Sequence, residues 1–218
     1  MKIDIAVEAG AKKAFATAVD WPGWSRSGKT EEAAVESLVA YASRYAPIAR
    51  AAGEAFDPDS IDAEVVERRS GGGGTDFGVP DQVKDQDHRA TTAADGKRLT
   101  ALVEAAWQAF DAAAKGAPEE LRKGPRGGGR DTSKVVDHVL GSEQAYATVM
   151  GIKRKEFPTS DRAQLDDLRA DMLAVLRAAS DGSPLSGKRW PVRYAAHRIA
   201  WHALDHTWEI EDRSEAAG

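Results

Sequence analysis

The sequence of 218 residues contains no cysteine, which excludes disulfide bonds and thiolate metal ligands. Any transition metal must therefore be held by histidines and carboxylates. No run of about 18 apolar residues is present, and no charged-then-apolar leader precedes the first periodic segment, so we expect a soluble, cytoplasmic protein. Histidine is also scarce: there are five, and all of them lie at residue 88 or beyond. Histidine chemistry is therefore expected in that part of the chain.

Neither acidic nor basic residues are in large excess, and the formal net charge is -5. Residues 1–87 contain 10 Lys and Arg against 16 Asp and Glu, whereas residues 88–218 contain 20 against 19. An acidic N-terminal part argues against electrostatic binding of nucleic acid there. We expect a small-molecule substrate, with no nucleic acid and no membrane as partner.

The N-terminal part has the periodicity of a small α+β domain. Residues Lys2–Glu8 and Lys13–Val19 alternate as the two strands of a hairpin, and a short third strand follows Trp24. Thr30 is a good N-cap for a helix reaching Tyr45, and Ile61–Val66 returns as a further strand. The predicted order is β-β-β-α-β.

This order, with Pro22-Gly23 before the third strand and Gly28-Lys29-Thr30 at the helix start, resembles the HicB-like domain over residues 1–69. The stretch Gly23–Thr30 also satisfies the P-loop pattern. A working P-loop needs a parallel doubly wound sheet and a second strand that ends in Asp, and neither is predicted downstream. We therefore interpret the stretch as a polar strand that ends at a helix cap.

A Gly-rich linker is predicted over residues 70–87, because four consecutive glycines and a polar segment lie there. Beyond it the apolar spacing changes to three and four, which predicts four helices. Their expected ranges are about Arg89–Lys115, Asp131–Met150, Asp161–Ala179 and Pro191–Asp212. The second domain is thus a helical domain over residues 88–213.

His202 and His206 lie four residues apart in the last of these helices, so both imidazoles occupy one face and can reach one ion. Glu209 extends the same stripe. Two histidines make at most half of a metal site, and a third ligand must come from elsewhere. His138 lies inside the second helix, where a lone histidine is more often a core residue than a ligand.

A helical domain with one histidine in its second helix and HxxxH in its last resembles the DinB-like superfamily of metalloenzymes. The resemblance covers residues 88–213, through Asp137-His138-Val139-Leu140 and Trp201–His206. It implies a four-helix bundle in the order up-down-down-up, with His138, His202 and His206 as metal ligands. The superfamily includes thiol S-transferases that use bacillithiol or mycothiol, so the resemblance also implies a low-molecular-weight thiol as cosubstrate.

Three neutral imidazoles leave a divalent ion its full charge and open positions, so it can activate a bound thiol or water. Zn, Ni and Fe(II) all suit such a ligand set. Asp205 and Glu209 are the candidate catalytic carboxylates, either orienting a ligand or acting as general base. The alternative is an exposed acidic pair on a solvated face, as charged residues usually are.

The positions of the histidines along their helices also predict topology. His138 lies near the start of its helix and His202 and His206 near the end of theirs, so they come level only if these two helices are antiparallel. That order requires a crossover over residues 151–160. It brings the loop that contains Arg126 and Arg130 to the metal end, beside Lys153–Lys155. We expect these cations to form the mouth of the site and to bind an anionic cosubstrate.

The other candidates are interpreted as structural. His88 and His197 lie off the stripe and are expected at the surface, and Trp107, Trp201 and Trp208 are expected in the core rather than as walls of a substrate pocket. Two function classes remain open. One is a metal-dependent thiol S-transferase or hydrolase, with the HicB-like domain as an accessory or homodimerisation element. The other is a non-enzymatic protein whose HicB-like domain binds a partner and whose bundle is a scaffold.

Overall fold

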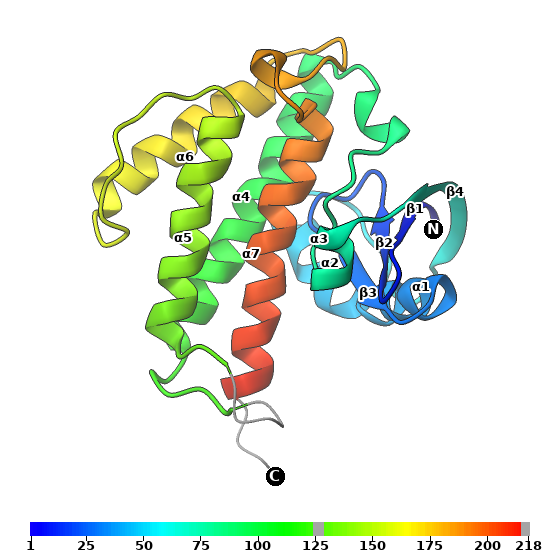
Figure 1. Cartoon of the computed structure of the whole chain (residues 1–218), viewed down its shortest axis with the longest axis horizontal. Coiled ribbons are helices and arrows are strands. Elements are labelled where there is room, and N and C mark those ends of the chain that lie inside the picture. Colours follow the sequence, from blue (N-terminus) through cyan, green and yellow to red (C-terminus); the bar gives the residue numbers. More distant parts are fainter. Residues whose placement is uncertain (124–128, 215–218) are drawn as a thin grey trace.

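A four-stranded sheet forms the first part of the chain. The computed structural model describes residues 1–123 and 129–214 (Figure 1). In it β1 (Lys2–Ala9) pairs antiparallel with β2 (Ala14–Ala18), β2 pairs with β3 (Ser25–Gly28), and β4 (Asp62–Ser70) lies parallel to β1. The strand order is β3-β2-β1-β4. The predicted hairpin and third strand are therefore confirmed.

Two helices, not one, separate β3 from β4. Thr30 caps α1 (Glu31–Ala40) as predicted, because its Oγ1 accepts a hydrogen bond from the Ala33 amide at 3.2 Å. The chain then bends at Tyr41 and continues as α2 (Ala42–Ala51), so the prediction of one helix reaching Tyr45 was wrong. β3 is an edge strand and pairs antiparallel with β2, so it does not belong to the parallel sheet that a P-loop requires. The P-loop pattern lies on this strand and on the cap of α1, as interpreted from the sequence.

The segment predicted as a linker is folded against the sheet. It begins with the last residue of β4 and contains α3 (Gly73–Phe77) and a short 3-10 helix, η1 (Asp85–His88). The buried carboxylate of Glu8 in β1 accepts hydrogen bonds from the Thr75 hydroxyl at 2.9 Å and from the Asp81 and Gln82 amides at 3.1 and 3.2 Å. These bonds satisfy a buried charge and fix the segment. The division of the chain into domains at this segment stays a prediction.

Four long helices follow. They are α4 (Ala93–Gly116), α5 (Thr132–Val149), α6 (Arg162–Arg177) and α7 (Val192–Ser214), with a 3-10 turn, η2 (Leu185–Gly187), before the last. Figure 1 shows α4 and α7 running in one direction and α5 and α6 in the other. Consequently α5 and α7 are antiparallel, as the positions of the histidines required. No helix of residues 1–123 and 129–214 is long and apolar enough to cross a membrane.

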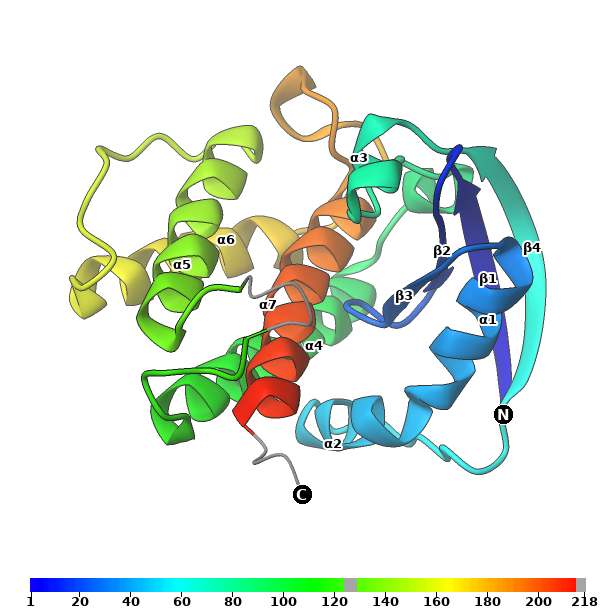
Figure 2. The same cartoon turned by 60° about the horizontal axis from the view of Figure 1, so that its bottom comes forward.

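The N-terminal part lies directly against α7 and α4 (Figure 2). Gly23 approaches α7 closely: its φ of +91° favours glycine, and a Cβ there would lie 2.7 Å from Leu204 Cδ1. His197 of α7 is only 8% exposed and its Nε2 lies 2.9 Å from the Val19 carbonyl oxygen. The prediction that His197 lies at the surface was therefore wrong, because the sequence does not show that this face of α7 is covered. His88 is exposed, as predicted.

Aromatic side chains fill the contact between the two parts. The Trp201 ring meets Phe15 of β2 edge-on at 6.1 Å between centroids, and Trp208 meets Tyr41 at 5.1 Å. Trp107, Trp201 and Trp208 are all at most 4% exposed. Their interpretation as core residues is confirmed, although two of them bury against the N-terminal part and not only between helices.

Candidate metal centre

Helices α5 and α7 bring three histidines together. His202 and His206 are one turn apart on the face of α7 that is turned toward α5, and His138 comes from the second turn of α5. One potential ligand atom from each of the three lies within 4.8 Å of the others. A pair that the sequence placed on one helix is thus completed by a residue that lies 64 positions earlier.

The geometry of the cluster suits a single ion. The Nε2 atoms of His138 and His202 are 3.2 Å apart. Two imidazole nitrogens bound at about 2.0–2.1 Å to one tetrahedral ion would lie about 3.3–3.4 Å apart, so this pair needs little movement, whereas the spread of up to 4.8 Å across all three ligand atoms must shorten when an ion binds. The ring centroids are 4.8–5.0 Å apart and the planes are steeply inclined, so the rings converge on a point instead of stacking.

The surroundings favour neutral imidazoles, which are the form that binds metal. His202 is 7% exposed, and burial, followed by the neighbouring histidines, holds its pKa well below the usual value. Burial is also the main reason why the pKa of His138 is lowered, with Arg130 adding to it. Both shifts favour the unprotonated ring.

Glu209 orients the third histidine. Its Oε2 lies 2.7 Å from His206 Nδ1, and its Oε1 accepts a hydrogen bond from Arg213 at 2.7 Å. The bond with His206 is the largest cause of the lowered pKa of Glu209, so this side chain is a carboxylate. A carboxylate at Nδ1 requires the proton on that nitrogen, which leaves Nε2 free for the ion.

Asp205 is engaged elsewhere. Its Oδ1 accepts a hydrogen bond at 3.0 Å from Arg26, a residue of β3. The Arg26 guanidinium also lies 3.9 Å from the centre of the Tyr41 ring and 5.4 Å from that of Trp208. Of the two predicted carboxylates, the structure thus brings Glu209 to the histidines and joins Asp205 to the N-terminal part.

The predicted cationic mouth is found only in part. Arg126 lies outside the described residues. Arg130 is exposed, and its charge contributes to the lowered pKa of both His138 and His202, which places it at the metal end. Lys153 instead lies beside Ser186 and Lys188 at the C-terminal end of α5, so its prediction at the mouth was wrong.

The crossover between α5 and α6 reaches the metal end through Thr159, not through Lys153–Lys155 as expected. Arg154 pairs with Asp171 of α6 at 2.7 Å, and Thr159 donates a hydrogen bond at 2.6 Å to Asp137, which precedes His138. Arg154, one of the cations of the crossover, therefore holds it against α6.

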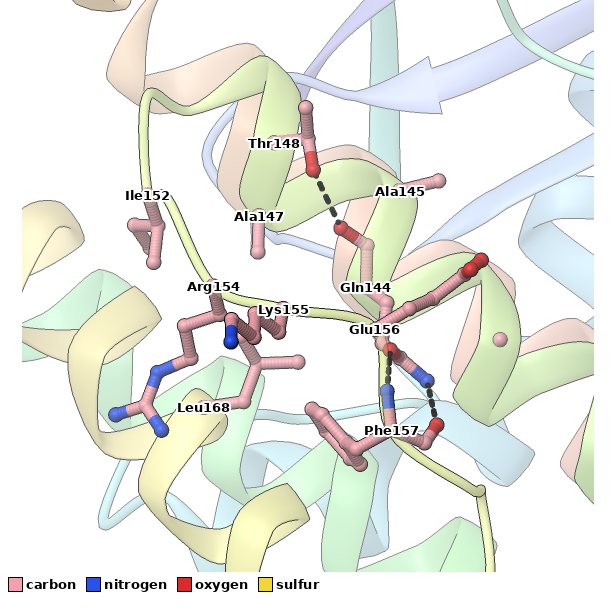
Figure 3. A pocket seen from close by; sticks show the side chains of 11 residues that line it. Gln144, Ala145, Ala147, Thr148, Ile152, Arg154, Lys155, Glu156, Phe157 and Leu168 are labelled. Atoms are coloured by element: carbon pink, nitrogen blue, oxygen red, sulfur yellow. Dashed lines mark hydrogen bonds between the residues drawn. The ribbon is translucent and has the colours of Figure 1, made fainter.

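A separate cavity of about 320 Å³ lies between α5 and the crossover (Figure 3). The Gln144 side chain fixes its wall, donating to the Phe157 carbonyl oxygen at 3.0 Å and accepting from the Phe157 amide at 3.2 Å. None of the three histidines lines this cavity. It is not an extension of the candidate metal centre.

Sequence reasoning missed three polar residues near the cluster. Arg213 fixes Glu209, and Arg198 and Tyr146 lie beside His202. Arg198 and Arg213 are each four residues from a member of the stripe, and Tyr146 is eight residues from His138. The same i, i+4 spacing that identified HxxxH would have found them.

Comparison with known proteins identifies the family of the helical part. The sequence model of the DinB superfamily matches residues 102–210, which are 109 of the 218 residues. Nuclear anchorage protein 1 of Caenorhabditis elegans is 35% identical over 117 residues, which cover 50% of this chain but 1% of that protein. No solved structure gives a significant match. The matched residues make up half of the chain and include all three histidines. The protein therefore belongs to the DinB superfamily.

Proposed function

We propose that the protein is a metal-dependent enzyme of the DinB type, with one divalent ion held by His138, His202 and His206. The observation that carries the proposal is the convergence of the three rings, with two Nε2 atoms 3.2 Å apart. His202 is 7% exposed and its Nε2 faces only the Nε2 of His138, so this buried ring has one polar partner unless an ion is shared between them. Membership of the DinB superfamily supports the same conclusion.

The residues around the cluster have distinct roles in this proposal. A bound Zn, Ni or Fe(II) ion would supply a Lewis acid that activates a thiol or a water molecule. Glu209 holds the proton on His206 Nδ1 and keeps that ring oriented, while the hydrogen bond from Arg213 holds the Glu209 carboxylate in place. Arg130 adds positive charge at the loop end, which attracts an anionic cosubstrate. The reaction class is thiol S-transfer or hydrolysis of a small molecule.

The architecture completes the proposal. The four long helices form a DinB-type bundle in the order up-down-down-up, which the antiparallel course of α5 and α7 supports (Figure 1). The N-terminal part is a HicB-like accessory module. Because Arg26 binds Asp205 between the two α7 histidines, the module supports the helix that carries the metal ligands.

Elemental analysis of protein purified without an affinity tag tests the function. We expect one divalent ion per chain, and loss of stoichiometric metal in His138→Ala, His202→Ala and His206→Ala with the helical circular dichroism preserved. His88→Ala is the matched control, since His88 is exposed and its ring contacts the Gly182 carbonyl oxygen. A wild-type protein that takes up no metal would favour a partner-binding scaffold instead.

A further inference from the structure

A cleft follows the C-terminal half of α5, away from the candidate metal centre. It consists of the cavity of about 320 Å³ between α5 and the crossover (Figure 3) and of an adjoining cavity of about 520 Å³ between the end of α5 and η2. The two cavities share Thr148, Ile152 and Arg154 in their walls, and none of the three histidines lines either of them. Each has the size of a small-molecule site, so the cleft can accept a ligand that does not reach the metal centre.

The walls of the cleft are fixed by hydrogen bonds between separate segments. Gln144 binds both backbone groups of Phe157, at 3.0 and 3.2 Å, and so joins α5 to the crossover. Arg154 donates to the Asp171 carboxylate at 2.8 Å and joins the crossover to α6. The shape of the cleft therefore exists before a ligand binds, which reduces the entropy that binding would cost.

Positive charge is in excess around the cleft. The basic side chains in its walls come from the crossover and from the turn before α7, and they are Lys153, Arg154, Lys155 and Lys188. Against these four stand two carboxylates, Glu156 in the wall and Asp171 paired with Arg154, so two positive charges are left over. Within the described part of the chain, none of the three lysines forms an ion pair. Cations that the fold does not neutralise attract an anion.

The floor of the cleft is apolar. Phe157 and Leu168 are 8% and 1% exposed, Ile152 is half-buried, and all three line the smaller cavity. An inorganic anion would bind the lysines but would leave this apolar surface in water. A ligand that uses the whole cleft therefore carries an apolar group beside its charge.

We propose that the cleft is a second ligand site, which binds a phosphorylated small molecule with an aromatic or other apolar group. A phosphomonoester carries about 1.5 to 2 negative charges at pH 7, which matches the two positive charges left over. Lysine binds phosphate as a mobile point charge, and it needs no fixed fork for this. The site is independent of the proposed function, because no metal ligand lines it.

NMR titration of the ¹⁵N-labelled, metal-free full chain with phenyl phosphate tests the site. Without an ion, the phosphate cannot bind to a metal at the histidines. We expect saturable shifts of the crossover amides and of the Gln144 side-chain amide. Phenyl sulfate has the same shape but a single charge, and it should bind about two- to fivefold more weakly. Inorganic phosphate lacks the ring and should bind about tenfold more weakly.

Variants of two exposed lysines test which charges hold the phosphate. Lys153→Met and Lys155→Met each remove one charge, and each should weaken binding of phenyl phosphate about two- to fivefold. The double variant should lose the preference for phenyl phosphate over phenyl sulfate. Lys97→Met, at an exposed lysine of α4 that lines neither cavity, is the matched control and should bind as wild type does.

The outcomes separate this site from the metal centre. Absence of saturable shifts in the cleft overturns the site, and so do shifts confined to the surroundings of His138, His202 and His206. Equal affinity for phenyl phosphate and phenyl sulfate in wild type, or an unchanged affinity in the double variant, overturns the assignment to a phosphomonoester. A protein that takes up no metal but binds phenyl phosphate in the cleft would overturn the proposed function and support the second site.

Discussion

The two faces of α7 differ in how their polar groups are satisfied. Toward the N-terminal part, Asp205 is paired with Arg26 and His197 is bound to the Val19 carbonyl oxygen. Toward α5, the Nε2 atoms of His138 and His202 are turned on each other at 3.2 Å, and His206 Nδ1 is bound to Glu209 of the same helix. One face is closed by the chain itself. The other has the composition of a face that a ligand completes.

This difference separates structural from functional polarity on a single helix. Both faces are largely buried and both contain histidine, so burial and residue type alone do not distinguish them. What distinguishes them is the partner: a buried polar group that serves the fold is hydrogen-bonded within the chain. His197 Nε2 is bonded to a backbone carbonyl oxygen, whereas His202 Nε2 faces the Nε2 of another histidine at 3.2 Å, a distance that also suits a shared ion.

The largest loss of stability is expected at Gly23, where the N-terminal part packs against α7. Gly23→Ala places a Cβ 2.7 Å from Leu204 and 3.0 Å from Ala200, at a φ of +91°. We expect the free energy of unfolding to fall by about 2–4 kcal/mol, since strain and overpacking add. Gly53→Ala is the control, because Gly53 has a φ of +79° but nothing lies within 4 Å of its added Cβ; it should cost about 1 kcal/mol. Equal losses in urea unfolding would contradict a tight fit between Gly23 and α7.

On the face of α7 turned toward α5, a change at Glu209 should weaken metal binding without replacing a metal ligand. Glu209→Gln removes the charge that fixes the proton of His206, and Glu209→Ala removes the hydrogen bond as well. We expect metal affinity to fall about tenfold in the first and up to about 100-fold in the second. Competition with a chromogenic chelator measures the change. Glu211→Gln, an exposed glutamate of the same helix that pairs with Arg44, should leave the affinity unaltered.

Much of this contrast was accessible from the sequence. The apolar spacing located the four long helices to within about four residues at each end, and HxxxH located the centre. The histidine positions also required α5 and α7 to be antiparallel. These inferences depend on the spacing of residues within each helix and on the short distance over which one ion can join its ligands.

The closed face could not be predicted, because it depends on contacts between distant residues. Nothing in the spacing of α7 shows that Val19 and Arg26 cover His197 and Asp205, which lie more than 170 residues away. The four glycines suggested a flexible linker, yet Glu8 binds the chain beyond them. Tertiary hydrogen bonds thus decided the positions that local composition left open.

Acidification should act on the closed face through His197. Burial lowers the pKa of His197 in the folded state, whereas the unfolded chain has an ordinary value near 6.5. Below about pH 6.5 the unfolded state therefore binds a proton that the folded state does not, and stability falls with decreasing pH by up to about 1.4 kcal/mol per pH unit for this group. Urea unfolding of metal-free protein between pH 7.5 and 5 measures the slope.

The matched variant for the pH experiment is His197→Gln. Glutamine can still donate to the Val19 carbonyl oxygen, but it does not titrate. The slope should become shallower by the contribution of one histidine, while that of His138 and His202, whose pKa values are also lowered, remains. A slope that does not change would show that His197 is not a source of the pH dependence.

The smallest effects are expected where the closed face reaches solvent. Arg26 and Arg44 both pair with acidic residues of α7, but the Arg26 side chain is 19% exposed and that of Arg44 29%, and the partners of Arg44 are about half exposed. Arg26→Ala should cost about 1–2 kcal/mol, because it removes a partly buried cation–π contact and leaves Asp205 unpaired. Arg44→Ala should cost less than about 1 kcal/mol, as exposed ion pairs do. In 1 M salt the loss in Arg44→Ala should shrink further, since exposed charges are screened, while most of the loss in Arg26→Ala should persist. If the two variants lose equal stability at both salt concentrations, Arg26 contributes no more than a surface charge to the contact between the N-terminal part and α7.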